Sequence, residues 1–264
     1  MAGASVARRE IVLPNAPALA MANRFSRYKP ETERAVRKVE VVEDETLKQM
    51  KEAWKKCSHT SSPATDYAKM LEFAQKLECS AKDIENFSLA LVEFQSENRF
   101  SDRVAIFLSA LINKSKETEF VIHTNHVAQP IHNLGYKNAK NITVEGNASN
   151  YVGYLMKDGI IIMHGSSGEN VGYYMEGGII KVNGDVGNYL AHCMKGGIIK
   201  VNGNAGDFVG ESMRGGIITT EGDTGHLGWD MQGGEIHLNG DYGNISNVID
   251  HGKIFHKGKL IVDK

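Results

Sequence analysis

The sequence predicts an α+β multidomain protein in which an N-terminal α-helical bundle precedes a parallel β-helix with 19-residue rungs. Three observations lead to this fold class. A 19-residue pattern recurs through residues 141–258, nearly all of the 28 glycines follow residue 134, and residues 44–113 carry apolar side chains at helical spacing. The change in composition marks a domain boundary between the helical part and the repeats.

The recurring pattern reads G-x-x-G-x-x-V-G-x-x-M-x-G-G-x-I-x-V-x, and a fixed period of this size is typical of a solenoid. Each copy opens with a turn glycine: Gly165, Gly184, Gly203, Gly222 and Gly240. One column of the aligned copies is isoleucine throughout: Ile142, Ile161, Ile180, Ile199, Ile218, Ile236 and Ile254. Another column is methionine, followed by Ile249 in the last copy: Met156, Met175, Met194, Met213 and Met231.

Alternation within the stretch I-I-K-V-N predicts a strand with two faces. Ile180 and Val182 are expected to point inward, while Lys181 and Asn183 point outward. The glycines allow positive φ angles or close approach between rungs, so the chain can turn and stack on itself at the strand spacing of ~4.8 Å. The uneven intervals between apolar residues exclude a hexapeptide β-helix. A leucine-rich repeat is excluded because its L-x-x-L-x-L string is missing, and calcium-binding nonapeptide repeats are excluded because their period is half as long.

The glycine frame and its x-M-x-G-G-x-I core resemble the GXGXG-type β-helix. This type forms the C-terminal domain of the glutamate synthase large subunit and occurs in one of the subunits of formylmethanofuran dehydrogenase. The resemblance covers residues 141–258 only, and it implies a right-handed helix that holds the catalytic parts of an enzyme in relation to one another. The redox and amidotransferase centres of those enzymes have no counterpart in this chain, so no cofactor is expected.

Composition narrows the class of protein further. The chain has 264 residues and a net charge of −2, and it lacks an apolar run of the ~18 residues that a membrane span needs. Cys57, Cys79 and Cys193 lie far apart without a C-x-x-C pair, which predicts neither disulfides nor a zinc or iron–sulfur site. A reducing, cytoplasmic location is therefore expected.

The first 40 residues form a basic N-terminal tail with few acidic side chains. The first 30 residues contain a single acidic residue, Glu10, and five basic ones: Arg8, Arg9, Arg24, Arg27 and Lys29. This composition resembles an organelle transit peptide, which would place the protein in an organelle matrix. The alternatives are an arm that docks on a partner or a merely flexible tail. Binding of nucleic acid is not expected from so few charges.

Residues 41–116 are expected to form a small antiparallel bundle of four amphipathic helices. Pro63 suits the opening of the second helix, and Ser80-Ala-Lys-Asp83 has the form of a capping box before the third. Residues 117–140 are expected to connect the bundle to the β-helix and to cap its first rung. The end of the 141–264 domain, from Lys259 on, is expected to cap the last rung.

Several side chains are candidates for a metal site. His123, His126 and His132 lie close in sequence, but His123 and His126 would occupy opposite faces of a strand unless the chain bends there. Two ladders of polar residues recur in the loops and are candidate calcium ligands: Asn147, Ser166, Asp185, Asn204, Asp223 and Asp241, then Asn150, Glu169, Asn188, Asp207 and Asn244. The competing interpretations are exposed connector histidines and ordinary turn residues beside glycine.

A catalytic interpretation has two candidate sites. Cys193 lies beside His192, although adjacent residues of an extended chain point apart. Glu211 and Asp230, with Tyr173 and Trp229, are candidates for a carbohydrate-processing groove. The exposed Lys181 and Lys200 form a short basic stripe, which is more simply solvated surface than a phosphate site.

The preferred hypothesis is a noncatalytic scaffold or assembly subunit of a larger complex. It would contact other protein subunits through the β-helix flank, the helical domain or the basic tail, as part of a glutamate-synthase-like or formylmethanofuran-dehydrogenase-like assembly. The alternative is an enzyme or ligand-binding protein with a groove on the rod, for example one that takes carbohydrate. Convergent carboxylates in a groove would favour the enzyme, and a flat apolar patch would favour the scaffold.

Overall fold

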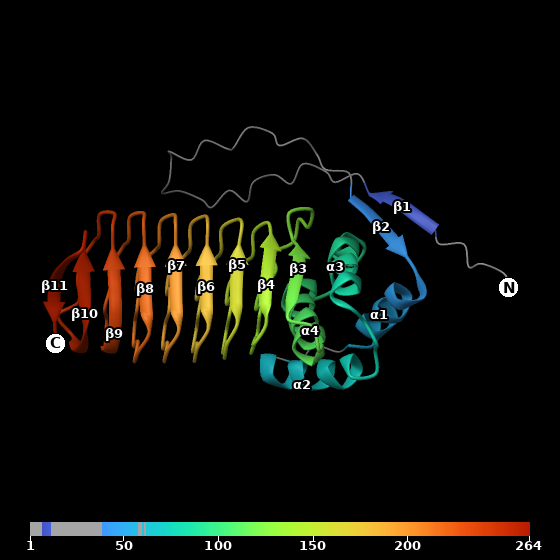
Figure 1. The fold of residues 1–264 in the computed structure, drawn as a ribbon, viewed down its shortest axis with the longest axis horizontal. Coiled ribbons are helices and arrows are strands. Elements are labelled where there is room, and N and C mark those ends of the chain that lie inside the picture. Colours follow the sequence, from blue (N-terminus) through green and yellow to red (C-terminus); the bar gives the residue numbers. More distant parts are fainter. Residues whose placement is uncertain (1–6, 12–38, 58–59, 61) are drawn as a thin grey trace.

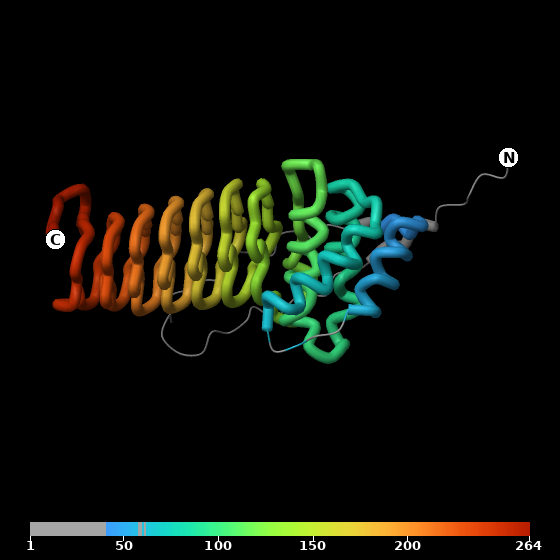
Figure 2. The backbone as a smooth tube through the Cα atoms, turned by 90° about the horizontal axis from the view of Figure 1, so that it is seen from below, coloured from blue at the N-terminus to red at the C-terminus, as the bar shows by residue number. Residues whose placement is uncertain are grey.

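Apolar alternation and glycine turns arrange this chain as a group of helices at one end of an elongated β-solenoid (Figures 1 and 2). The structure is a computed structural model, and it describes residues 7–11, 39–57, 60 and 62–264. The predicted α+β fold class is confirmed. Most of the predicted basic tail lies outside the described residues. Its strand β1 (Ala7–Ile11) pairs antiparallel with β2 (Val39–Glu43).

Four α-helices precede the solenoid in the described part of the chain. They are α1 (Glu45–Lys56), α2 (Pro63–Ala74), α3 (Ala81–Leu89) and α4 (Phe100–Lys114), with a 3₁₀ turn η1 at Ala90–Glu93. Trp54 is fully buried among aromatic rings at centroid distances of 5.9–6.2 Å, and the Arg103 guanidinium lies 4.3 Å from its ring centroid. This cluster forms the core of the helical part.

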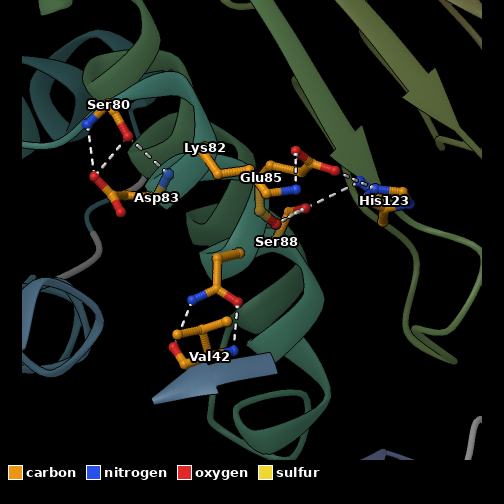
Figure 3. Close-up of polar contacts among 8 residues, drawn as sticks. Val42, Ser80, Lys82, Asp83, Glu85, Ser88 and His123 are labelled. Carbon is orange, nitrogen blue, oxygen red and sulfur yellow. Dashed lines mark hydrogen bonds and ion pairs between the residues drawn. The ribbon is translucent and has the colours of Figure 1, made fainter. Parts of the chain in front are cut away.

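Helix α3 attaches the helices to the first strand of the solenoid (Figure 3). Its start is the predicted capping box, in which Ser80 Oγ accepts from the Asp83 N–H and the Asp83 carboxylate accepts from the Ser80 N–H. Further along the helix, Ser88 Oγ accepts a 3.0 Å hydrogen bond from the His123 backbone N–H. Helix side chains therefore satisfy part of the exposed edge of the sheet, which would otherwise be open to another chain.

The solenoid contains a nine-stranded sheet whose neighbours follow chain order. Its strands are β3 (Glu119–His123), β4 (Asn141–Glu145), β5 (Ile160–Met163), β6 (Ile179–Val182), β7 (Ile198–Val201), β8 (Ile217–Thr220), β9 (Met231–Leu238), β10 (Ile249–His256) and β11 (Lys259–Asp263). Successive strands from β3 to β10 pair in parallel, with Ile161 opposite Ile180 and Ile180 opposite Ile199. The resulting coils of about 19 residues make a parallel β-solenoid.

The two ends of the solenoid differ from its middle. At the start, β3 pairs in parallel with β4, and Phe120 lies opposite Ile142. The sheet thus begins inside residues 117–140, which the sequence assigns to a connector and cap. The 22-residue step from Phe120 to Ile142 and the sparse glycines hide this coil from the repeat pattern. At the far end, β11 turns back and pairs antiparallel with β10.

The interior of the solenoid is a stack of identical side chains. The seven isoleucines of the repeat are at most 1% exposed, and the five methionines are 0% exposed. The first four methionines each lie against the second glycine of the G-G pair in the next coil. At Gly216, for example, φ is +96° and an added Cβ would lie 2.7 Å from Met194 Cε. The M-x-G-G pattern therefore recurs because the methionine of one coil packs against the glycine pair of the next coil.

Candidate functional site

A row of mostly aromatic side chains runs along one flank of the solenoid, with one member in each coil. The coil register places Tyr154, Tyr173, His192, Glu211 and Trp229 at equivalent positions, because each backbone carbonyl accepts from the preceding coil at the same point. The ring centroids of Tyr154 and Tyr173 are 5.1 Å apart, as are those of Tyr173 and His192. The row therefore continues with a repeat close to the strand spacing.

A second row lies three residues earlier in each coil. Tyr189 stacks on Phe208 at 4.9 Å with an interplanar angle of 11°, and Phe208 stacks on His226 at 6.3 Å. Tyr189 also lies 5.8 Å from His192 and so joins the two rows. We call this surface the aromatic strip. It comprises Glu211 and the rings of Tyr151, Tyr154, Tyr173, Tyr189, His192, Phe208, His226 and Trp229.

Each end of the aromatic strip opens into a hollow. The larger, of about 460 Å³, lies between the helical part and the first coils, and Tyr151, Tyr154 and Tyr173 form part of its wall. The smaller, of about 340 Å³, lies toward the C-terminal end and includes Phe208 and Trp229. The Trp229 side chain is 52% exposed, so an aromatic face is available to a ligand.

The three candidate histidines occupy separate environments. His123 Nε2 lies 3.2 Å from Glu85 Oε1 on α3 (Figure 3). His126 is 2% exposed, and burial lowers its pKa to about 4. His132 lines the larger hollow, and burial also lowers its pKa. Among the described residues, no group of three or more His, Cys, Asp or Glu side chains is placed to hold a metal ion.

The polar loop ladders connect one coil to the next. Asn147 Oδ1 accepts from the Ser166 N–H at 2.8 Å, and Asp185 Oδ1 accepts from the Asn204 N–H at 2.7 Å. Asn204 Oδ1 continues the ladder by accepting from the Asp223 N–H at 2.8 Å. The second ladder contains the same bond between Asn188 Oδ1 and the Asp207 N–H, at 2.9 Å. These oxygens therefore satisfy backbone donors at the turns.

The turn glycines are required by these ladders. The position of a Cβ on Gly203 is occupied by Asp185 Oδ1, and the Gly184 carbonyl oxygen lies 2.6 Å away. Gly222 has the same relation to Asn204 and the Gly203 backbone. Neither glycine has positive φ, so close approach rather than backbone conformation excludes a side chain here.

The remaining candidates lie on or beside the aromatic strip. His192 and Cys193 are adjacent, and the described contacts of the His192 ring are with Tyr173 and Tyr189. Glu211 lies between His192 and Trp229 along its row. Asp230 is one position further on and accepts from Ser212 Oγ at 3.1 Å. Of the proposed groove residues, Tyr173, Glu211 and Trp229 thus share one row.

A second surface was not singled out by the sequence. The first residue of each strand from β5 to β8 is an isoleucine that points outward: Ile160, Ile179, Ile198 and Ile217. These four pair in register, and Ile162 extends the group on β5. We call these five residues the isoleucine patch. Three are followed, two residues later, by an outward lysine or threonine, and Ile217 is 36% exposed.

The chain was compared with protein-family models and with curated proteins. No protein-family model matches the chain, and no curated protein matches it. Within the described residues, no helix is both long and apolar enough to cross a membrane.

Proposed function

We propose that this chain is a noncatalytic assembly subunit, whose solenoid is a stiff rod that docks on another protein through the isoleucine patch. The supporting observation is the patch itself. Ile160, Ile179, Ile198 and Ile217 continue across four coils. Polar residues follow at both ends, with Asn141 opposite Ile160 and Glu235 opposite Ile217. A bounded apolar stripe on a regular sheet face is typical of a protein interface.

The charges beside the patch indicate the chemistry of its partner. Lys181 and Lys200 are exposed, lie opposite each other on β6 and β7, and follow the patch by two residues on the same outward face. Such a border favours a partner surface with apolar side chains next to acidic ones, because charge complementarity increases the association rate and fixes orientation.

Hydrogen bonds between coils are expected to make the rod stiff. Each coil donates backbone hydrogen bonds to the next through the strands, and the loop ladders add bonds such as that from the Asn204 N–H to Asp185. A surface that keeps its shape loses little entropy on binding. The Met–Gly contacts between coils are the feature shared with the GXGXG-type pattern, and they support a role like that of the glutamate synthase or formylmethanofuran dehydrogenase β-helices. The helical part and basic tail are not part of that pattern, so the complex can be a different one.

The test compares which proteins co-purify with the tagged wild-type chain and with two tagged variants, each isolated from the native source. In the double variant Ile179→Glu and Ile198→Glu, we expect stoichiometric partner subunits to be lost while circular dichroism stays that of the wild type. The control is Leu260→Glu, which changes a side chain that is 42% exposed on β11, away from the patch. Retention of every partner by the double variant would contradict the proposal.

A further inference from the structure

The aromatic strip is separate from the isoleucine patch, and its chemistry points to a different ligand. We propose that the aromatic strip binds an extended, uncharged polysaccharide chain, laid along the solenoid across successive coils. This proposal is independent of the assembly role, because the two surfaces share no residue. It assigns a binding site to the rod and involves no bond-breaking step.

The spacing of the strip suits a linear chain of sugar rings. Tyr154, Tyr173, His192, Glu211 and Trp229 occupy five consecutive coils. Four steps at the strand spacing give a length of roughly 19 Å. Neighbouring rings are 5.1 Å apart from Tyr154 to His192. One coil thus corresponds to about one pyranose ring, and the strip to a short oligosaccharide.

The side chains combine apolar faces with planar polar groups. Exposed Trp229 offers a flat surface for the C–H face of a sugar, and half-buried Tyr173, which lies between Tyr154 and His192, adds a phenolic hydroxyl to the row. Glu211 lies between aromatic members of the row and offers carboxylate oxygens to hydroxyl groups. Asn244 and Asn247 in the smaller hollow add carboxamide groups beside Trp229. Sugars present this same alternation of apolar and hydroxyl surface.

The charges on the strip disfavour nucleic acid and acidic polysaccharides. No lysine is among the described residues that form the strip or line its hollows, and the arginine there, Arg99, is ion-paired with Asp102 at 3.0 Å. Phosphate-rich ligands need cations for most of their affinity. Glu211 and Asp230 would repel further negative charge.

The backbone of the strip disfavours an added peptide strand. The Tyr174 N–H donates to the His192 carbonyl, and the Cys193 N–H donates to the Glu211 carbonyl, so donors and acceptors here are used between coils. Strand addition requires a free edge. A ligand that binds through its own ring faces and hydroxyls needs no such edge.

Fluorescence of the full-length chain provides the test. The chain has two tryptophans; Trp54 is 0% exposed and Trp229 is 52% exposed. A saccharide on the strip should therefore change the emission of Trp229 alone. The probes are hexaoses of β-1,4-linked glucose, xylose and mannose and of α-1,4-linked glucose, with an oligogalacturonide as the charged comparison.

We expect saturable binding of at least one neutral hexaose, tighter than that of its dimer, and no binding of the oligogalacturonide. Isothermal titration should show affinity for that hexaose reduced roughly tenfold or more in Trp229→Ala and in Tyr173→Ala. Leu260→Ala, on β11, should bind as the wild type does. The proposal is overturned if no neutral hexaose binds the folded protein, or if both strip variants bind unchanged. It is equally overturned if the strip variants lose a protein partner instead.

Discussion

Single atoms decide which residues the loop ladders tolerate. Asp185 Oδ1 takes the space of a Cβ on Gly203, while the same oxygen accepts from the Asn204 N–H. A sequence alone shows that glycine recurs at this position, and it allows either positive φ or close approach as the reason. The structure assigns the second reason, which depends on the register between coils.

Gly203→Ala should lower the free energy of unfolding by about 2–3 kcal/mol, because the new methyl group overlaps Asp185 and the Gly184 backbone. Urea unfolding followed by circular dichroism measures the change. Asn202→Ala, at the neighbouring exposed side chain, is the control and should change stability by less than about 0.5 kcal/mol. Equal effects of the two substitutions would show that the predicted overlap is relieved at no cost.

Ala191 departs from the glycine frame and offers the opposite experiment. Its φ is +60°, and the equivalent residues of neighbouring coils are Gly172 and Gly210, with φ of +72° and +69°. Ala191→Gly should raise the free energy of unfolding by about 0.5–1 kcal/mol, because glycine adopts this conformation without the clash of a Cβ. A thermal melt would detect the change. A clear loss of stability would mean that packing of the methyl group outweighs the backbone strain.

His126 should make stability depend on pH. Burial lowers its pKa to about 4 from its usual 6.5, so between these values the unfolded chain binds a proton that the folded chain does not. The contribution of this residue to stability is therefore lost as pH falls, by about 2 kcal/mol between pH 7 and pH 5.

Urea unfolding of His126→Gln at both pH values measures this contribution. The variant should lose less stability than the wild type over the same interval, by about that amount. An identical pH dependence in the two proteins would contradict a lowered pKa of His126 in the folded chain.

The sequence repeat predicts most coils of the solenoid, but it does not predict the first coil. The isoleucine and methionine columns indicate strands β4 to β10 because each inward position repeats with the coil. The coil containing β3 lacks that signal, since its step is 22 residues and Phe120 replaces the isoleucine. The capping box at Ser80 was predictable because it is local in sequence.

The isoleucine patch and part of the aromatic strip could be predicted from the aligned repeats. Alternation alone requires that the first isoleucine of I-I-K-V faces outward, so the isoleucine patch could have been found. The shared position of Tyr173, Glu211 and Trp229 was visible in the aligned copies. The hollow beside Tyr154 was not, because it depends on how α2 and the turn before α4 pack against the first coils.

The methionine column should contribute to stability coil by coil. Met194→Ala removes a fully buried side chain that packs against Gly216, and should cost about 2–5 kcal/mol. Met194→Leu keeps the volume and should cost less than about 1.5 kcal/mol. Chemical denaturation of the two variants tests the contrast. Equal losses would mean that the shape of the thioether, rather than its volume, is required between the coils.

The whole molecule is a rod with helices at one end and two distinct surfaces along its length. The isoleucine patch lies on the outer face of β5 to β8, and the aromatic strip follows the loops of the same coils. Because every coil presents its outward residues at the same position, a partner can contact several coils at once. We propose that this rod is one subunit of a larger assembly.

The assembly role is tested by native mass spectrometry of the protein, gently purified from its native source. We expect a species heavier than the 29.0 kDa chain, containing it at fixed stoichiometry with other polypeptides. In the double variant Ile179→Glu and Ile198→Glu, the same preparation should yield the 29.0 kDa chain alone. A wild-type protein that is monodisperse at 29.0 kDa would contradict the assembly role.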